Sequence, residues 1–256
     1  MKKVLGTGVV AVALLAANIA SALTDKNVFK CEDKAVAAVN KWGGARGKCL
    51  TKCQLKKVKE GPTSTRVCSN PPGLDSETAT CTTTADQKYV TAAVAACPTG
   101  TFPTCGPYAG ENPTTYANGQ IIAQSGLVDA TTVPLLICND AAAKCEGKVV
   151  GSLAKLSAAV GKCLAKCYKA LQVKGDTTLQ CTPQAPPNPF APLDVTTKGC
   201  IDAAVAAATT AIGAACPTLP PCGIYLGGPT ALLGLVTDNI AGNYATPSSN
   251  PYCTLP

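Results

Sequence analysis

The chain has 256 residues, of which 46% are hydrophobic and 14% charged, and its formal net charge is +7. It contains no histidine, which excludes Ser–His and Cys–His nucleophile pairs and an imidazole general base. It also contains no Cys-x-x-Cys pair, which excludes thioredoxin-type exchange and zinc ribbons. Any metal site would therefore need carboxylates or unpaired cysteines, and we expect no cofactor, no metal ion and no enzyme activity.

The N-terminus has the three parts of a secretory signal. Lys2 and Lys3 precede an uncharged run over residues 4–17, and the small residues Ala20, Ser21 and Ala22 follow. This pattern predicts a signal peptide over residues 1–22 with cleavage after Ala22. The alternative is a retained membrane anchor. Cleavage would make the protein secreted or periplasmic and lower its net charge from +7 to +5, because Lys2 and Lys3 leave with the signal.

The sixteen cysteines, an even number in an exported chain, predict a disulfide framework. Aromatic residues make up only 4% of the chain, so the core must be built from Ala, Val, Leu and Ile. Such small side chains bury little area each, and cross-links would offset that weakness by restricting the unfolded chain.

An internal repeat divides the chain into two modules, residues 23–139 and 140–256, each with eight cysteines. In both copies the first three cysteines are spaced by 18 and then 4 positions, and a later pair is spaced by 16. The predicted disulfide cysteines of the first module are Cys31, Cys49, Cys53, Cys68, Cys81, Cys97, Cys105 and Cys138. Those of the second are Cys145, Cys163, Cys167, Cys181, Cys200, Cys216, Cys222 and Cys253.

Apolar residues recur every three or four positions over 149–170, which predicts a long helix. The equivalent segment, 35–53, contains Gly43-Gly44 and Arg46 on its apolar side, and we expect a kink there. Second helices are predicted over 82–96 and 201–215, each followed by a proline, and a weaker helix over 230–241. The predicted fold class is all-α: two tandem disulfide-stapled helical modules with long Pro/Gly-rich loops.

Helix geometry restricts the disulfide pairing, because 18 residues along a straight helix span on the order of 27 Å. Cys145 therefore cannot reach Cys163 or Cys167 within one helix. An antiparallel second helix predicts Cys53–Cys81 and Cys167–Cys200, and we further expect Cys105–Cys138 and Cys222–Cys253.

Two sets of polar residues recur in both copies. The lysines, a candidate binding surface, are Lys34, Lys41, Lys48, Lys52, Lys148, Lys155, Lys162 and Lys166. They could bind an anionic polymer or cell-surface component, or they could form a solvated helix face. The second set, Asp75 and Asp194, could serve a carboxylate-dependent enzyme or could cap helices.

The Lys-Cys-Leu-x-Lys-Cys segments (48–53 and 162–167) and the Ala-rich segments 81–98 and 200–217 resemble uncharacterised secreted repeat proteins of environmental bacteria, rich in Ala, Lys and Cys. That resemblance implies no activity. Three hypotheses therefore remain. The first is a secreted non-enzymatic structural or interaction protein that presents two similar surfaces or self-associates. The second is a carrier of an apolar small molecule or lipid, held between helices whose side chains are too small to fill the space. The third is an enzyme that uses Asp75 and Asp194.

Overall fold

The computed structural model describes residues 24–68, 73–132, 143–184, 186, 188–221, 223–245 and 250–252. The predicted signal peptide (1–22) and the predicted module boundary at 139/140 lie outside these residues. Within the described ranges the fold is all-α, as predicted, with six α-helices and no strand. The helices are α1 (Lys26–Glu60), α2 (Ser76–Ala96), α3 (Pro113–Thr132), α4 (Ala143–Lys174), α5 (Val195–Ala215) and α6 (Gly228–Tyr244). In this part of the chain, no helix is both long and apolar enough to cross a bilayer.

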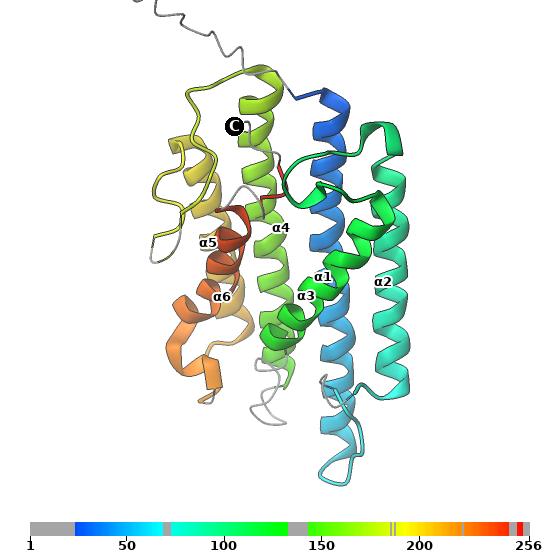
Figure 1. Ribbon diagram of the computed structural model, residues 1–256. Helices are drawn as coiled ribbons and strands as arrows, with labels where there is room; N and C mark the ends of the chain where they lie inside the picture. The colour runs from blue at the N-terminus through cyan, green and yellow to red at the C-terminus, as the bar shows by residue number, and fades with distance from the viewer. Residues whose placement is uncertain are drawn as a thin grey trace, which may run out of the picture.

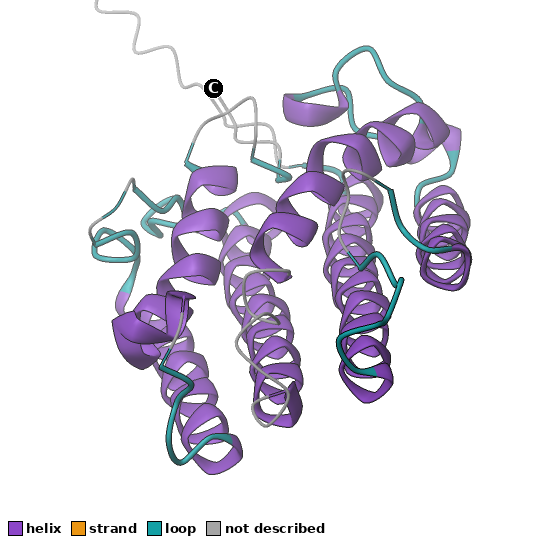
Figure 2. Cartoon of the chain, turned by 90° about the horizontal axis from the view of Figure 1, so that it is seen from below, coloured by secondary structure: helices purple, strands orange, loops and turns teal. Residues whose placement is uncertain are grey.

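The helices form two layers (Figures 1 and 2). The four helices α2, α1, α4 and α5 stand side by side in that order, each antiparallel to its neighbour, and α1 and α4 pack together at the centre. Helices α3 and α6 lie across one face of this row. Helix α3 contacts α1 and α2, whereas α6 contacts α4 and α5. None of the described helices covers the opposite face of the row.

Aspartate side chains begin three of the long helices. Asp25 accepts from the amide of Asn27 at 2.7 Å, and Asp75 and Asp194 accept from the amides three residues later, both at 3.0 Å. Each bond satisfies one of the amide groups that a helix leaves unpaired at its N-terminus. Helices α2 and α5 therefore begin directly after these aspartates, six residues earlier than the sequence pattern predicted for each.

In each half of the chain, three disulfides join pairs of described residues, at equivalent positions. They are Cys31–Cys97, Cys49–Cys81 and Cys53–Cys68 in the first half, and Cys145–Cys216, Cys163–Cys200 and Cys167–Cys181 in the second. The predicted pairs Cys53–Cys81 and Cys167–Cys200 are wrong by one helical turn. Because α2 and α5 begin early, their cysteines reach Cys49 and Cys163, and the loop cysteines take the partners that remain. Cys105 is also disulfide-bonded, but Cys138, Cys222 and Cys253 lie outside the described residues.

The prediction for α1 needs correction, and one helix was missed. Helix α1 runs without interruption through Gly43 and Gly44, where a kink was expected. Arg46 is only 6% exposed on the inner side of α1, and it is tolerated there because its Nη1 lies 3.8 Å from Oδ1 of Asp86 on α2. Helix α3 was not predicted at all.

The C-terminal segment joins the two halves. The ring of Tyr252 stacks on Phe29 of α1 and on Tyr168 of α4, with centroid distances of 5.5 and 4.8 Å. The hydroxyl of Tyr108, a fully buried residue after α2, donates to the carbonyl of Pro251 at 3.0 Å. The two halves therefore share one interior and are not two independent domains.

Candidate functional site

The space between the two layers contains a cavity of about 400 Å³, which we call the inner cavity. Helices α1 and α4 form its floor, and α3 and α6 form its roof. It lies at the centre of the molecule, where the two modules meet. Ligand pockets typically have volumes of roughly 300–1,000 Å³, and domain interfaces and the spaces between bundled helices are among their preferred places.

The lining of the inner cavity is mostly apolar and carries no charged side chain among the described residues. Its larger apolar members are Val39, Trp42, Val128, Leu153, Val236 and Ile240. Its polar members are the amides and hydroxyl of Asn40, Gln120, Gln124, Ser157, Asn239 and Asn243. A few amide groups in an apolar wall can orient a ligand by hydrogen bonds, but they offer no counter-ion.

Glycines on the floor leave this space open. Gly43 and Gly44 lie on α1, and a Cβ at Gly43 would meet Cγ2 of Val128 only at 3.6 Å, an ordinary contact. Across the seam, Gly161 of α4 allows the two helices to approach closely, because a Cβ there would lie 2.9 Å from Nδ2 of Asn40. The glycines thus bring the floor helices together while removing the side chains that would fill the cavity above them.

A second hollow, which we call the outer groove, runs along the uncovered side of the same two helices. Its volume is about 710 Å³, and every described residue that lines it belongs to α1 or α4. The floor is made of alanine, valine and glycine together with two polar residues, Asn40 and Thr51. The lining residues that it shares with the inner cavity are Val36, Asn40, Gly44, Val150, Ala154 and Gly161.

The structure brings most of the predicted lysine surface to this groove. The lysines that line it are Lys41, Lys48, Lys52, Lys155 and Lys162. The other three, Lys34, Lys148 and Lys166, lie on the same helices but are not among its lining residues. All eight side chains are exposed, and in the described ranges none is ion-paired with a carboxylate.

The structure places Asp75 and Asp194 at the N-termini of α2 and α5 rather than at either hollow. Each carboxylate also lies close to a disulfide, with Asp75 Oδ2 3.1 Å from Sγ of Cys53 and Asp194 Oδ2 3.2 Å from Sγ of Cys167. In each module a carboxylate oxygen of the aspartate and two cysteine Sγ atoms lie within 4.8 Å of one another, as the ligands of a metal ion would. These sulfurs are engaged in disulfides, so they offer no thiolate to a metal ion.

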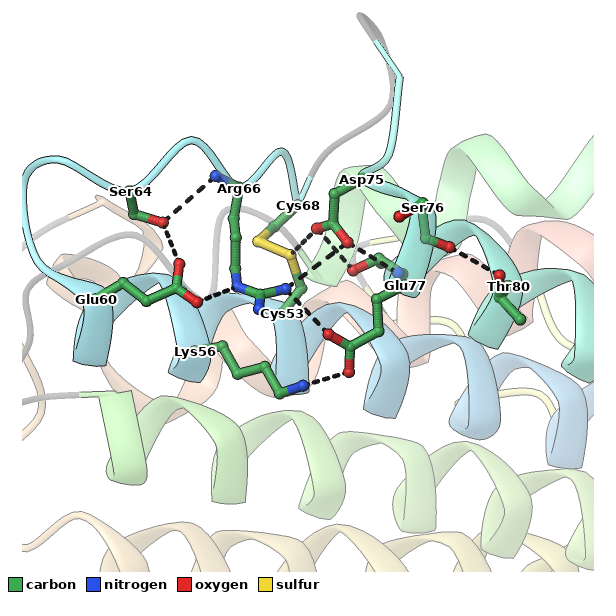
Figure 3. A network of polar contacts seen from close by, with 11 residues as sticks. Cys53, Lys56, Glu60, Ser64, Arg66, Cys68, Asp75, Ser76, Glu77 and Thr80 are labelled. Atoms are coloured by element: carbon green, nitrogen blue, oxygen red, sulfur yellow. Dashed lines mark hydrogen bonds and ion pairs between the residues drawn. A yellow bond between two sulfur atoms is a disulfide. The ribbon is translucent and has the colours of Figure 1, made fainter.

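Asp75 also belongs to a network of charges on the loop between α1 and α2 (Figure 3). Arg66 lies at its centre, with Nε 2.7 Å from Glu60 and Nη1 3.1 Å from Glu77, and Lys56 also pairs with Glu77. Burial disfavours the ionised form of Asp75, but hydrogen bonds from Thr78 and the charge of Arg66 outweigh it and lower the pKa of this carboxyl. The network therefore stabilises the loop between α1 and α2.

Comparison of the chain with known protein families, with curated proteins and with solved structures gave no match. The resemblance to secreted Ala-, Lys- and Cys-rich repeat proteins therefore stays a prediction. The sequence suggested a space between helices with small side chains, but not its position or its lining residues. The Gly43-Gly44 pair, which lies on the cavity floor, was interpreted as a kink.

Proposed function

We propose that this protein is a non-enzymatic binding protein that is exported to an oxidising environment and holds an uncharged, largely apolar small molecule in the inner cavity. The observation that carries the proposal is the cavity itself, about 400 Å³ between two helical layers. This is the carrier hypothesis drawn from the sequence, in which helices with small side chains leave space for a ligand.

The chemistry of the lining defines the class of ligand. Burying a charged group without a partner is costly, and the described lining contains no charged side chain. The ring of Trp42 and the aliphatic side chains favour a hydrocarbon or aromatic body. The amides of Gln120 and Gln124 favour one or two hydroxyl, carbonyl or amide groups on the ligand.

The disulfides support a permanently formed site. Cys49–Cys81 fixes α1 to α2, and Cys163–Cys200 fixes α4 to α5, so both floor helices are tied to their outer neighbours. A wall that is already ordered before binding loses little conformational entropy when a ligand enters. The same disulfides form and persist in an oxidising environment, and export through the predicted signal peptide would provide it.

The geometry gives less support to the other two hypotheses, a carboxylate-dependent enzyme and a structural or self-associating protein. The carboxylates of Asp75 and Asp194 are committed to helix caps, which supports a structural role for both. A purely structural or self-associating protein has no need of a preformed central cavity.

The test is binding of an uncharged apolar dye such as Nile red to the oxidised protein. We expect a rise in dye fluorescence that saturates, and we expect Gly43→Leu to weaken binding by at least about tenfold, because its side chain would occupy the cavity. Gly199→Leu is the matched control, since Gly199 is an exposed helix residue of α5 whose Cβ would meet nothing within 4 Å. Absence of dye binding, or equal binding by Gly43→Leu and wild type, would overturn the proposal.

A further inference from the structure

The two lysine stripes that the sequence shows on separate modules border one groove in the folded protein. We propose that the outer groove binds a single-chain anionic amphiphile, with its alkyl chain on the groove floor and its charged head among the lysines. This site lies on the other side of α1 and α4 from the inner cavity, with which it shares six lining residues, and the lysines line the groove alone.

The packing of α1 against α4 sets the arrangement of the lysines. Gly44 faces Ala154, Thr51 faces Gly147 and Val36 faces Gly161, so the two helices run antiparallel. Lys162 and Lys52 consequently mark opposite ends of the groove, and Lys41, Lys48 and Lys155 lie between them. The α1 side of the groove extends from residue 33 to residue 52, which is on the order of 28 Å along a helix. That length suits one extended alkyl chain.

The floor of the groove is mostly apolar along this length, with Asn40 and Thr51 as its polar members. Its side chains are those of Val36, Ala37, Val150, Ala154 and Ala158, with Gly44, Gly147, Gly151 and Gly161 between them. The side chains between the two rows of lysines are small on both helices, so none of them fills the groove. An alkyl chain placed there would be removed from water, which stabilises it by roughly 0.8 kcal/mol per buried CH₂.

The charge around the groove is strongly one-sided. Five lysines line it, against one acidic residue, Asp33, which stands at one end of the groove. The Asp33 carboxylate accepts a long hydrogen bond of 3.4 Å from the hydroxyl of Tyr252. The lysine ammonium groups are exposed and make no ion pair within the described structure, so they remain available to an anionic head group.

The combination of floor and rim selects the ligand class. An anionic polysaccharide or nucleic acid needs positive charge on an open surface, and it gains nothing from an apolar floor. An uncharged lipid gains nothing from the lysines. Only a molecule with both an alkyl chain and an anionic head uses the apolar floor and the charged rim together, and the volume of about 710 Å³ is in the range of small-molecule sites.

The experiment measures binding of dodecyl sulfate, as monomer below its micelle concentration, by calorimetry on the oxidised protein. Lys48→Gln/Lys155→Gln removes one charge from each helix of the rim. Lys30→Gln/Lys169→Gln makes the same change in net charge at exposed positions of the same helices that do not line the groove. Gly151→Leu fills the floor of the groove alone, since Gly151 has open space around its Cβ and does not line the inner cavity.

We expect dodecyl sulfate to bind with the rim variant weakened by at least about fivefold, the control variant unchanged, and Gly151→Leu weakened as strongly as the rim variant. Dodecyl maltoside, which has the same chain and no charge, should bind more weakly than dodecyl sulfate. Equal loss in the rim and control variants would overturn the proposal, as would binding that Gly151→Leu leaves intact. Binding of heparin or of anionic vesicles in the absence of binding to monomeric dodecyl sulfate would also overturn it. Nile red binding to the inner cavity should survive in Gly151→Leu, which separates failure of this site from failure of the proposed function.

Discussion

The two modules have equivalent disulfides and equivalent aspartate caps, but their interiors are built from different side chains. One continuous cluster of buried apolar residues extends through α4, α5 and α6 of the second module and also takes in Phe29 and Val36 of α1. In the first module the buried residues fall into two smaller clusters, one around Cys31 and Tyr108 and the other around Trp42 and Tyr89. The same framework thus encloses a larger apolar core in one copy than in the other.

The clearest difference lies where the first two helices of each module meet. In the first module, Nε1 of Trp42 donates to Oδ1 of Asp86 at 2.6 Å, and the buried Arg46 lies beside the same carboxylate. The repeat places Leu156, Val160 and Val205 at the equivalent positions of the second module. Buried polar groups stabilise a fold only while each keeps its partner. The comparison teaches that the first module depends on specific polar contacts and the second on apolar burial.

The largest effect on stability is expected when each module loses the described disulfide that joins the cysteines furthest apart in its sequence. Cys31–Cys97 and Cys145–Cys216 close loops of similar length, with sequence separations of 66 and 71, so the loss of loop-closure entropy is about 4 kcal/mol in either case. Any difference in hydrogen-exchange protection between Cys31→Ala/Cys97→Ala and Cys145→Ala/Cys216→Ala therefore comes from the difference between the two cores. We expect the first variant to lose hydrogen-exchange protection throughout α1 and α2, and the second to retain protection in α4. Equal loss of protection would contradict the difference between the cores.

The next largest effect on stability is expected from the polar contacts among Trp42, Arg46 and Asp86 in the first module. Asp86→Ala removes the acceptor of Trp42 and a partner of the buried Arg46, and we expect the free energy of unfolding to fall by about 2–3 kcal/mol. Val205→Ala, the equivalent change in the second module, removes half-buried methyl groups and should cost about 1 kcal/mol. Urea denaturation measures both. The triple variant Trp42→Leu/Arg46→Val/Asp86→Val, which copies the second module, should recover stability relative to Asp86→Ala, and a further loss would contradict this account.

A smaller effect is expected from pH. Hydrogen bonds from Ser64 and Arg66 lower the pKa of Glu60, and contacts with Lys56 and Arg66 lower the pKa of Glu77, both from an ordinary value of 4.5. Since the folded-state pKa values lie below those of the unfolded chain, the stabilisation is present above about pH 4.5 and is lost as the pH falls through the folded values. The equivalent positions of the second module, Lys174 and Thr196, form no such network.

Thermal unfolding at pH 7, 5 and 3 measures this effect. Below pH 4.5 the wild-type protein should lose stability, and Arg66→Leu should reduce that loss. High salt should also reduce it, because these groups are exposed. A pH response that Arg66→Leu leaves unchanged would assign the acid sensitivity to other carboxylates.

Much of the fold follows from the sequence, because periodicity and cysteine spacing report on local structure. The long helices α1 and α4 were predicted from their apolar period, and α2 and α5 were predicted except for their first turns. The error had a local cause, since Asp75 and Asp194 are caps and the helices begin directly after them. Had the cap been used to place the helix start, Cys81 and Cys200 would have fallen one turn further from the loop, opposite Cys49 and Cys163.

Helix α3 shows a different limit. Its sequence has no apolar period, and the signal that could have found it is Asn112, whose side chain accepts from the amides of Thr114 and Thr115 at 3.0 Å, followed by Pro113 at the first helical position. The inner cavity could not be predicted, because it depends on how α3 and α6 cross the other layer. The lysines could be found from the repeat, but only the antiparallel packing of α1 and α4 brings both sets to one groove.

The measurement that tests the central claim most directly is the native mass of the oxidised protein purified from its own producer. We predict a population heavier than the polypeptide, whose extra mass is a neutral molecule that leaves on collisional activation. Gly43→Leu should abolish that population and Gly199→Leu should keep it. If the wild-type protein carries only its bare polypeptide mass, or if Gly43→Leu retains the added molecule, the inner cavity is not the binding site and the account is contradicted.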